Sequence, residues 1–139
     1  MDREDKTSFG VFKPEGHTVI SFASAEQAAR AHAALGELGL QGDDVRRYTD
    51  REMLSQIEHD IERASPLASV GQEMNLVLAH KALAERGYHW LVVRTPEDEL
   101  ARRVADCVKP LGAERAQRYG RFIIEELIEH PGEPPQVAE

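Results

Sequence analysis

The sequence is short of cysteine, of long apolar runs and of basic charge, and each shortage excludes a class of protein. A single cysteine, Cys107, excludes an intramolecular disulfide framework and CxxC metal or redox motifs. No stretch is long and apolar enough to span a bilayer, and the charged start MDREDKTSFG lacks the apolar run of a signal peptide. We therefore expect a cytoplasmic protein with no membrane partner.

Basic residues are outnumbered by acidic ones. The 17 lysines and arginines face 25 aspartates and glutamates, which gives a formal net charge of −8. A negative protein repels the phosphate backbone, and no series of aromatic residues accompanies the arginines at positions 115, 118 and 121. We expect no nucleic-acid partner.

The length and composition fit one globular domain. A chain of 139 residues buries a sizeable core without metals or disulfides, so the whole of 1–139 is expected to fold as one unit. Residues 1–8 are predicted to be a flexible N-terminus. Residues 131–139, PGEPPQVAE, are predicted to be a flexible acidic tail.

The first half of the chain reads as strand, helix and strand. HTVISFA at 17–23 has the β-branched and aromatic content of a strand. Ser24 and Gln27 have capping-box spacing at the start of a helix, and Gly39 marks its end. The fairly polar segment DDVRRYT at 43–49 predicts a strand at a sheet edge.

A pair of helices is predicted as an insertion at 50–87. Thr49 and Glu52 cap the first helix, which has a narrow apolar stripe and one wet face. The second, from about 69 to 86, is apolar over most of its circumference. We expect it to be covered on two sides, by the domain and by the first helix or another subunit.

The second half repeats the order strand, helix and strand. GYHWLVVRT at 87–95 is nearly continuous in bulky residues and is expected to be central in the sheet. Thr95 is predicted to cap the next helix, with Pro96 in its first turn. A last strand is predicted around Arg118 to Ile124.

This order of elements favours an α+β fold, a ferredoxin-like split βαβ sandwich with the two-helix insertion between strands two and three. An even number of inserted helices returns the chain to the same end of the sheet, so strand three lies antiparallel between strands one and two. A flavodoxin-like α/β fold with a parallel sheet is the alternative.

No catalytic motif is present, and the candidate ligand-binding residues are His80, Glu73, Arg115 and Arg118. His80 lies among apolar neighbours on the second inserted helix, although helical geometry does not place Glu73 beside it. Arg115 and Arg118 are expected to lie near the start of the Ser24 helix, where they would hold an anion with its amides or pair with nearby acids.

Other features suggest ordinary structure. In ASPLASVGQEMNLVLAH, residues 64–80, Gly71 is followed by Gln72 and Glu73 where a phosphate loop needs lysine, so residues 65–71 are interpreted as a helix joint. No histidine pair has zinc spacing, so neither metal ligands nor a cofactor are assigned. The polar face Glu52, Gln56, His59 and Arg63 is interpreted as a solvated surface.

The layout of HTVISFASAEQAARAHAALGELGLQGDDVRRYT and YHWLVVRTPEDELARRVADCVKPLGAERAQRYG resembles small bacterial general-stress, heat-induced-type domains. The resemblance implies two βα units joined by a helical segment, and it implies no residue-level site. The leading hypothesis is a non-enzymatic, stress-related interaction domain that forms a homodimer. The alternatives are a small-ligand or anion sensor and a metal-dependent enzyme.

Overall fold

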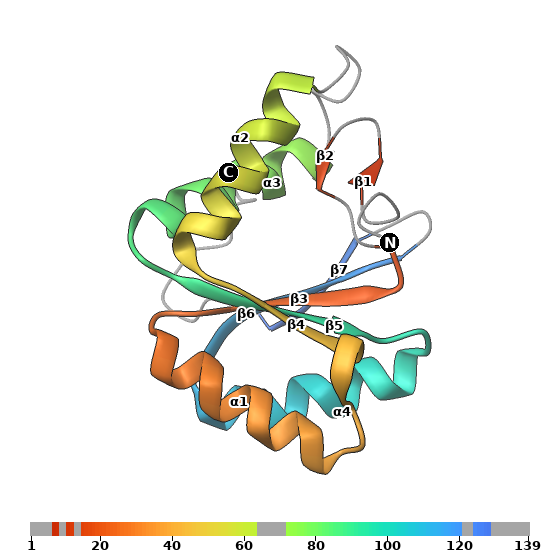
Figure 1. The fold of residues 1–139 in the computed structure, drawn as a ribbon. Helices are drawn as coiled ribbons and strands as arrows, with labels where there is room; N and C mark the ends of the chain where they lie inside the picture. The colour runs from red at the N-terminus through yellow and green to blue at the C-terminus, as the bar shows by residue number, and fades with distance from the viewer. Residues whose placement is uncertain (1–6, 9–10, 13–14, 64–71, 121–123, 129–139) are drawn as a thin grey trace.

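The computed structural model describes residues 7–8, 11–12, 15–63, 72–120 and 124–128, which form an α+β fold (Figure 1). A five-stranded antiparallel sheet has the strand order β4-β5-β3-β6-β7. The strands are β3 (His17–Phe22), β4 (Val45–Tyr48), β5 (His89–Arg94), β6 (Ala113–Tyr119) and β7 (Ile124–Ile128). A separate two-stranded pair joins β1 (Thr7–Ser8) to β2 (Val11–Phe12).

Two pairs of helices cover the two faces of the sheet, so the fold has three layers (Figure 1). The helices are α1 (Ala25–Glu37), α2 (Asp50–Arg63), α3 (Gln72–Glu85) and α4 (Asp98–Val108). Helices α1 and α4 lie on one face, while α2 and α3 pack on each other over the opposite face. Two short 3₁₀ turns, η2 (Gly42–Asp44) and η4 (Lys109–Leu111), precede β4 and follow α4.

Strand alternation divides the core into two apolar clusters, one on each face of the sheet. Val19, Trp90 and Val92 pack under α2 and α3, while Ile20 and Leu91 pack against α1 and α4. Strand β5 contributes to both clusters and lies between β3 and β4, in agreement with its prediction as a central strand. Strand β4 lies at the sheet edge, also as predicted.

The capping signals account for where two helices begin. The Ser24 hydroxyl accepts a hydrogen bond from the Gln27 amide at 3.2 Å, so α1 begins as expected. Thr49 and Glu52 form a reciprocal box: the Glu52 amide donates to Thr49 Oγ1 at 3.1 Å, and the Thr49 amide donates to Glu52 Oε1 at 2.9 Å. The chain therefore turns directly from β4 into α2.

Three expectations were wrong. Every strand pairing among the described residues is antiparallel, which excludes the flavodoxin-like alternative. Thr95 does not cap α4, because its hydroxyl is buried in a 2.8 Å hydrogen bond with Thr18 Oγ1, and Glu97 takes the N-cap position. The strand expected at 118–124 is instead the end of β6 and the start of β7.

Parts of other expectations lie outside the described residues. These are most of the predicted flexible N-terminus (1–6), the acidic tail (131–139), the helix joint (65–71) and the first residues of the second inserted helix (69–71). In the parts of the chain that are described, no helix is long and apolar enough to cross a membrane.

Candidate functional site

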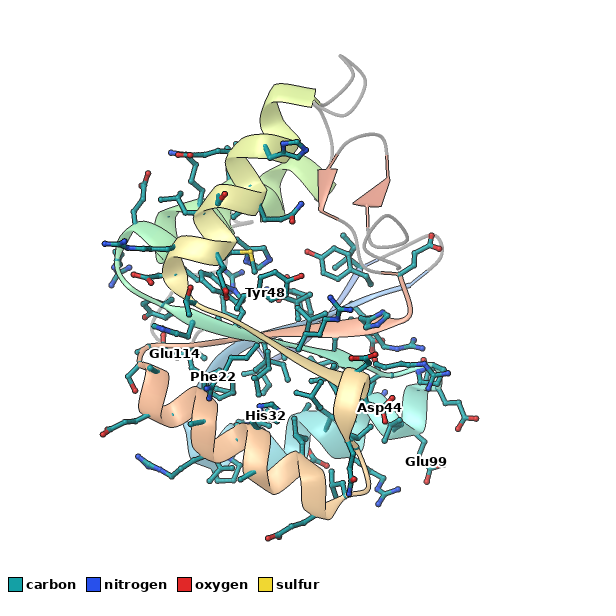
Figure 2. The ribbon with its side chains drawn as sticks, in the orientation of Figure 1. Phe22, His32, Asp44, Tyr48, Glu99 and Glu114 are labelled. Carbon is teal, nitrogen blue, oxygen red and sulfur yellow. The ribbon has the colours of Figure 1, made fainter. Side chains whose placement is uncertain are left out.

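A hollow of about 710 Å³ opens between the edge strand β4 and helix α2. Its position is marked by Tyr48, which lies between α2 and the sheet (Figure 2). We call it the arginine hollow. Its lining residues are Asp43, Arg46, Arg47, Tyr48, Arg51, Glu52, Ser55, Gln56 and His59.

Three arginines are among the residues that line the arginine hollow, and their side chains have no partner in the described structure. Arg46 and Arg47 come from β4, and Arg51 comes from the first turn of α2. None of the three side chains forms a hydrogen bond or ion pair with another described residue. Arginine presents planar donors that match carboxylate and phosphate oxygens, so unpaired arginines that line one hollow favour an anionic ligand.

The two acids of the hollow do not cancel this positive charge. Three arginines against Asp43 and Glu52 leave a formal charge of +1 in a chain whose net charge is −8. One Glu52 carboxylate oxygen also accepts the Thr49 amide at the helix cap. The lining residues of the hollow are therefore positive in sum although the chain is acidic overall, and this balance favours a small anion over a cation.

The core on the other side of α2 holds the walls of the hollow in place. Met53 and Ile57 have no exposed surface, and both pack under α2 in the cluster that contains Trp90. Because residues on a helix repeat every 3.6 positions, burying these two side chains leaves Ser55 and His59 on more exposed parts of α2. Arg46, which lies opposite Val92 on the α2 face of the sheet, and Arg51 on α2 thus belong to two packed elements beside the hollow.

A second group of polar residues is buried between α3 and the sheet, on the face that α2 and α3 cover. His80 is 2 % exposed, and its Nε2 lies 3.5 Å from Tyr119 Oη. Its ring meets Trp90 edge to face, with 5.9 Å between ring centroids and an interplanar angle of 81°. The strand register places Trp90 opposite Ser21, and Ser21 opposite Arg115. His80 therefore lies over a cross-strand row.

The environment of His80 keeps its imidazole neutral. Burial, and secondly the positive charge of Arg115, lower the pKa of His80 to about 4. At neutral pH this side chain can donate one hydrogen bond and accept one.

The structure brings together two of the four predicted site residues. His80 and Arg115 are close enough to interact electrostatically. Glu73 lies in α3 seven residues before His80, and its side chain is outside the described residues. Arg115 faces His80, because Ser21 and Arg115 lie opposite each other on the α3 side of the sheet.

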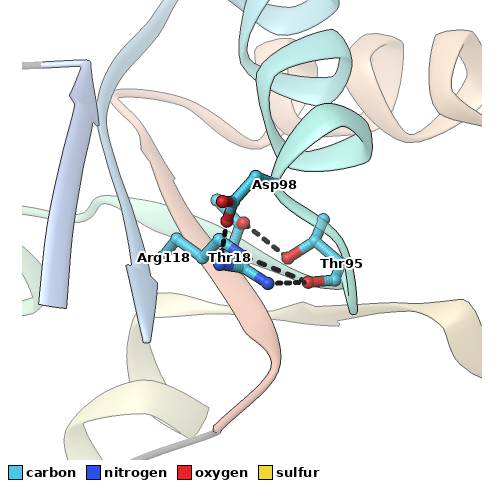
Figure 3. A network of polar contacts seen from close by, with 4 residues as sticks. All are labelled: Thr18, Thr95, Asp98 and Arg118. Carbon is cyan, nitrogen blue, oxygen red and sulfur yellow. Dashed lines mark hydrogen bonds and ion pairs between the residues drawn. The ribbon is translucent and has the colours of Figure 1, made fainter. Parts of the chain in front are cut away.

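Arg118 lies elsewhere and has a structural role (Figure 3). Its Nη1 donates to Asp98 Oδ1 at 2.6 Å, while Nε and Nη2 donate to the carbonyl oxygen of Thr95 at 3.1 and 3.0 Å. The guanidinium thus ties β6 to the start of α4 beside the Thr18–Thr95 hydrogen bond. Pairing with an acid was the ordinary alternative expected from the sequence, although the acid is Asp98.

Nothing in the described structure adds a metal or thiol site. In its described ranges, no three histidine, cysteine, aspartate or glutamate side chains form a metal-binding group. Burial, and secondly the Glu37 carboxylate, raise the pKa of the Cys107 thiol, as expected of a structural cysteine.

Sequence reasoning missed the arginine hollow, although part of its wall was noticed. Glu52, Gln56 and His59 were interpreted as a solvated helix face, and all three line the hollow. The missed signal was RRYTDR at 46–51, which places three arginines at the junction of an edge strand and a helix. The sequence does not show that the helix folds back beside its own strand.

The comparisons with known proteins add no relative. No protein-family model matches this chain, and no curated protein or solved structure matches it either. The resemblance to general-stress domains stays an expectation, and the geometry of the site carries the functional argument.

Proposed function

We propose that this chain binds a small organic anion in the arginine hollow. The observation that carries the proposal is that Arg46, Arg47 and Arg51 all line one hollow of about 710 Å³ and have no ion-pair partners among the described residues. Ligand pockets commonly fall between about 300 and 1,000 Å³. The size and charge suit a phosphorylated metabolite or a molecule with several carboxylates, and they correspond to the anion-sensor alternative.

The lining suggests how such a ligand would be oriented. The guanidinium groups of Arg46 and Arg51 would hold the charged end from the strand and from the helix. Ser55, Gln56 and His59 would meet uncharged polar parts of the ligand along α2. The Tyr48 ring, which packs against the core, would supply an apolar wall.

Isothermal titration calorimetry with inorganic phosphate, pyrophosphate, ATP and citrate tests this proposal at constant ionic strength. A hydrogen bond to a charged group contributes about 1.5–3 kcal/mol, so the Arg46→Gln/Arg51→Gln variant should bind at least about tenfold more weakly. The matched control is Arg102→Gln/Arg103→Gln, which removes two exposed arginines from α4 on the opposite layer. Equal loss in both variants, or no binding by any of the four anions, would count against the hollow as a site.

Self-association is a second candidate function, and one exposed side chain favours it. Leu78 on α3 is 49 % exposed and is the large apolar residue that lies open to solvent in the described part of the chain. A second copy would cover it, in line with the homodimer expected from the apolar character of this helix. Sedimentation velocity at high concentration tests the idea. A strict monomer would oppose it, as would a Leu78→Glu variant with an unchanged dimer.

We further infer a ferredoxin-like arrangement for part of the sheet. Support comes from the order β6-β3-β5-β4 and from the two helices, α1 and α4, on one face. Strand β7 extends this unit beyond β6, and the α2–α3 pair inserted between β4 and β5 covers its second face. The single cysteine is compatible with the expected cytoplasmic location. The stress-related role stays a prediction.

A further inference from the structure

Buried polar atoms without hydrogen-bond partners concentrate at one place in this fold. Six buried side-chain nitrogen or oxygen atoms lack a partner in the described residues, and five of them lie on the α2–α3 face of the sheet. We call these residues the buried polar cluster. They are Ser21, His80, Trp90, Arg115 and Gln117, through Oγ, Nδ1, Nε1, Nε and Oε1.

Burial makes this concentration costly. Ser21 and Gln117 are 1 % exposed, and Trp90 has no exposed surface. A buried polar group without a hydrogen bond costs on the order of 1–3 kcal/mol. Single buried polar atoms without a partner can be explained one at a time, but four such atoms on one sheet face together with one on the helix above it require a common explanation.

The strand register holds three hydrogen-bond donors in one row. Trp90 on β5, Ser21 on β3 and Arg115 on β6 are direct cross-strand neighbours. Opposite residues in an antiparallel sheet have Cβ atoms about 4.5–5.5 Å apart and point to the same side. The three unpartnered donors, Trp90 Nε1–H, Ser21 Oγ–H and Arg115 Nε–H, therefore share one surface of the sheet.

The chemistry of the row selects its ligand. An indole N–H and a guanidinium N–H only donate, and a hydroxyl can donate as well. Arg115 forms no ion pair with any residue that the structure describes, so its positive charge is not compensated by a carboxylate there. Three donors with one net positive charge favour an oxyanion. Because the donor atoms are buried, the bound group must be small.

We propose that Trp90, Ser21 and Arg115 form a second binding site that takes a small oxyanion of carboxylate size, with His80 above it. Neutral His80 adds a polar atom, Nδ1, without competing as a second cation. Gln117, two residues after Arg115 on β6 and on the same face of the sheet, borders the row through its own unpartnered oxygen. Arg115 is only partly buried, so solvent reaches this residue at the β6 end of the row.

This site is separate from the arginine hollow, although the two are neighbours. Tyr48 lines the hollow and lies opposite Trp90 in the register. The order across the sheet is thus Tyr48, Trp90, Ser21 and Arg115. The inference does not depend on the proposed function, because no arginine contributes to both sites.

Tryptophan fluorescence tests the inference directly, because Trp90 is the only tryptophan in the chain. The protein is titrated with formate and with acetate, and chloride replaces them at equal ionic strength in the control. We expect a saturable change in Trp90 emission with the carboxylates and none with chloride. Collisional quenching is a minor contribution, since Trp90 has no exposed surface.

Two variants separate this site from general ionic effects. Arg115→Gln removes the charge and should weaken carboxylate binding at least about tenfold, since a hydrogen bond to a charged group contributes about 1.5–3 kcal/mol. Arg102→Gln, on the exposed surface of α4, should bind as the unmodified protein does. The Arg46→Gln/Arg51→Gln variant should also keep the response, which distinguishes failure here from failure of the arginine hollow.

A second measurement, which uses the unmodified protein, keeps the proposal testable if Arg115→Gln does not fold. In the unmodified protein, a bound anion beside His80 favours the imidazolium, so acetate should raise the pKa of His80 measured by NMR. The proposal is overturned if neither carboxylate changes Trp90 emission or the His80 titration in the folded protein. It is also overturned if the response is linear and the same in all variants.

Discussion

Lowering the pH from 7 to 5 should destabilise this protein through His80. The pKa of His80 is lowered to about 4 in the folded protein, mainly by burial, while an unfolded histidine has a pKa of about 6.5. Between these values the unfolded chain binds a proton that the folded chain does not. The free energy of unfolding therefore rises with pH in this window, and the contribution of His80 is lost as the pH falls from about 6.5 toward about 4.

The size of the effect follows from the two pKa values. Integrating proton binding from pH 7 down to pH 5 gives a loss of about 2 kcal/mol, and the full difference corresponds to about 3 kcal/mol. Total stabilities of small domains are only about 5–15 kcal/mol, so a loss of this size is measurable. Arg115 adds to the cost of protonation, because its charge would lie near the new imidazolium.

Urea unfolding at pH 7, 6 and 5, in buffers without carboxylates, measures this contribution. The His80→Gln variant keeps a polar side chain that does not titrate, so its stability should fall by about 2 kcal/mol less than that of the unmodified protein. His59→Gln is the matched control, because His59 is exposed on α2 and lies outside the buried polar cluster. The other titrating groups are common to all three proteins and cancel.

The reasoning is refuted if the unmodified protein and His80→Gln lose stability in parallel between pH 7 and pH 5. It is also refuted if His59→Gln removes as much of the pH dependence as His80→Gln does. Either result would mean that burial of His80 does not set the acid response of the fold.

Two further substitutions test the opposite face and a turn. Thr18→Val alone should lower the free energy of unfolding by about 1–3 kcal/mol, because it leaves the buried Thr95 hydroxyl without its partner. The double variant Thr18→Val/Thr95→Val should lower it by less than the single change. Chemical denaturation compares the variants, and a double variant worse than the sum of the singles would contradict this account. Gly112→Ala should lower the free energy of unfolding by about 1–3 kcal/mol, because Gly112 has a φ of 106° and an added Cβ would lie 2.5 Å from Gln27 Nε2. A thermal melting temperature equal to that of the unmodified protein would contradict this expectation.

Much of the fold was predictable because its strongest signals are local. The bulky run in β5 predicted a central strand, and the Ser24 and Thr49 boxes predicted two helix starts. These features depend on neighbouring residues in the sequence, which is where pattern reasoning is strongest.

The errors come from contacts between distant residues. Thr95 has the spacing of a cap, but a buried hydrogen bond to Thr18, 77 residues away, takes its hydroxyl. Strand β6 was misplaced because its buried positions include Ala113 and Ala116, which give a weak apolar alternation. Register shifts in its pairing with β3 and with β7 weaken the pattern further.

The candidate sites show the same division. His80 stood out because a histidine among apolar helix positions is visible in the sequence, and the structure buries it. Its neighbours Trp90, Ser21 and Arg115 come from three strands, so only the register identifies them as a row. The arginine hollow is formed within residues 43–59, yet it exists only because α2 packs beside β4.

The pairing of β3 has a consequence for how the chain folds during synthesis. Strand β3 near the N-terminus pairs with β6, and His17 lies opposite Tyr119, 102 residues later. The residues from β3 to β6 must therefore all be synthesised before the middle of the sheet can close. Until then, β3 has no partner on its β6 side, and the loop that must close is long. We therefore expect the slow step of folding to be the joining of β3 to β6.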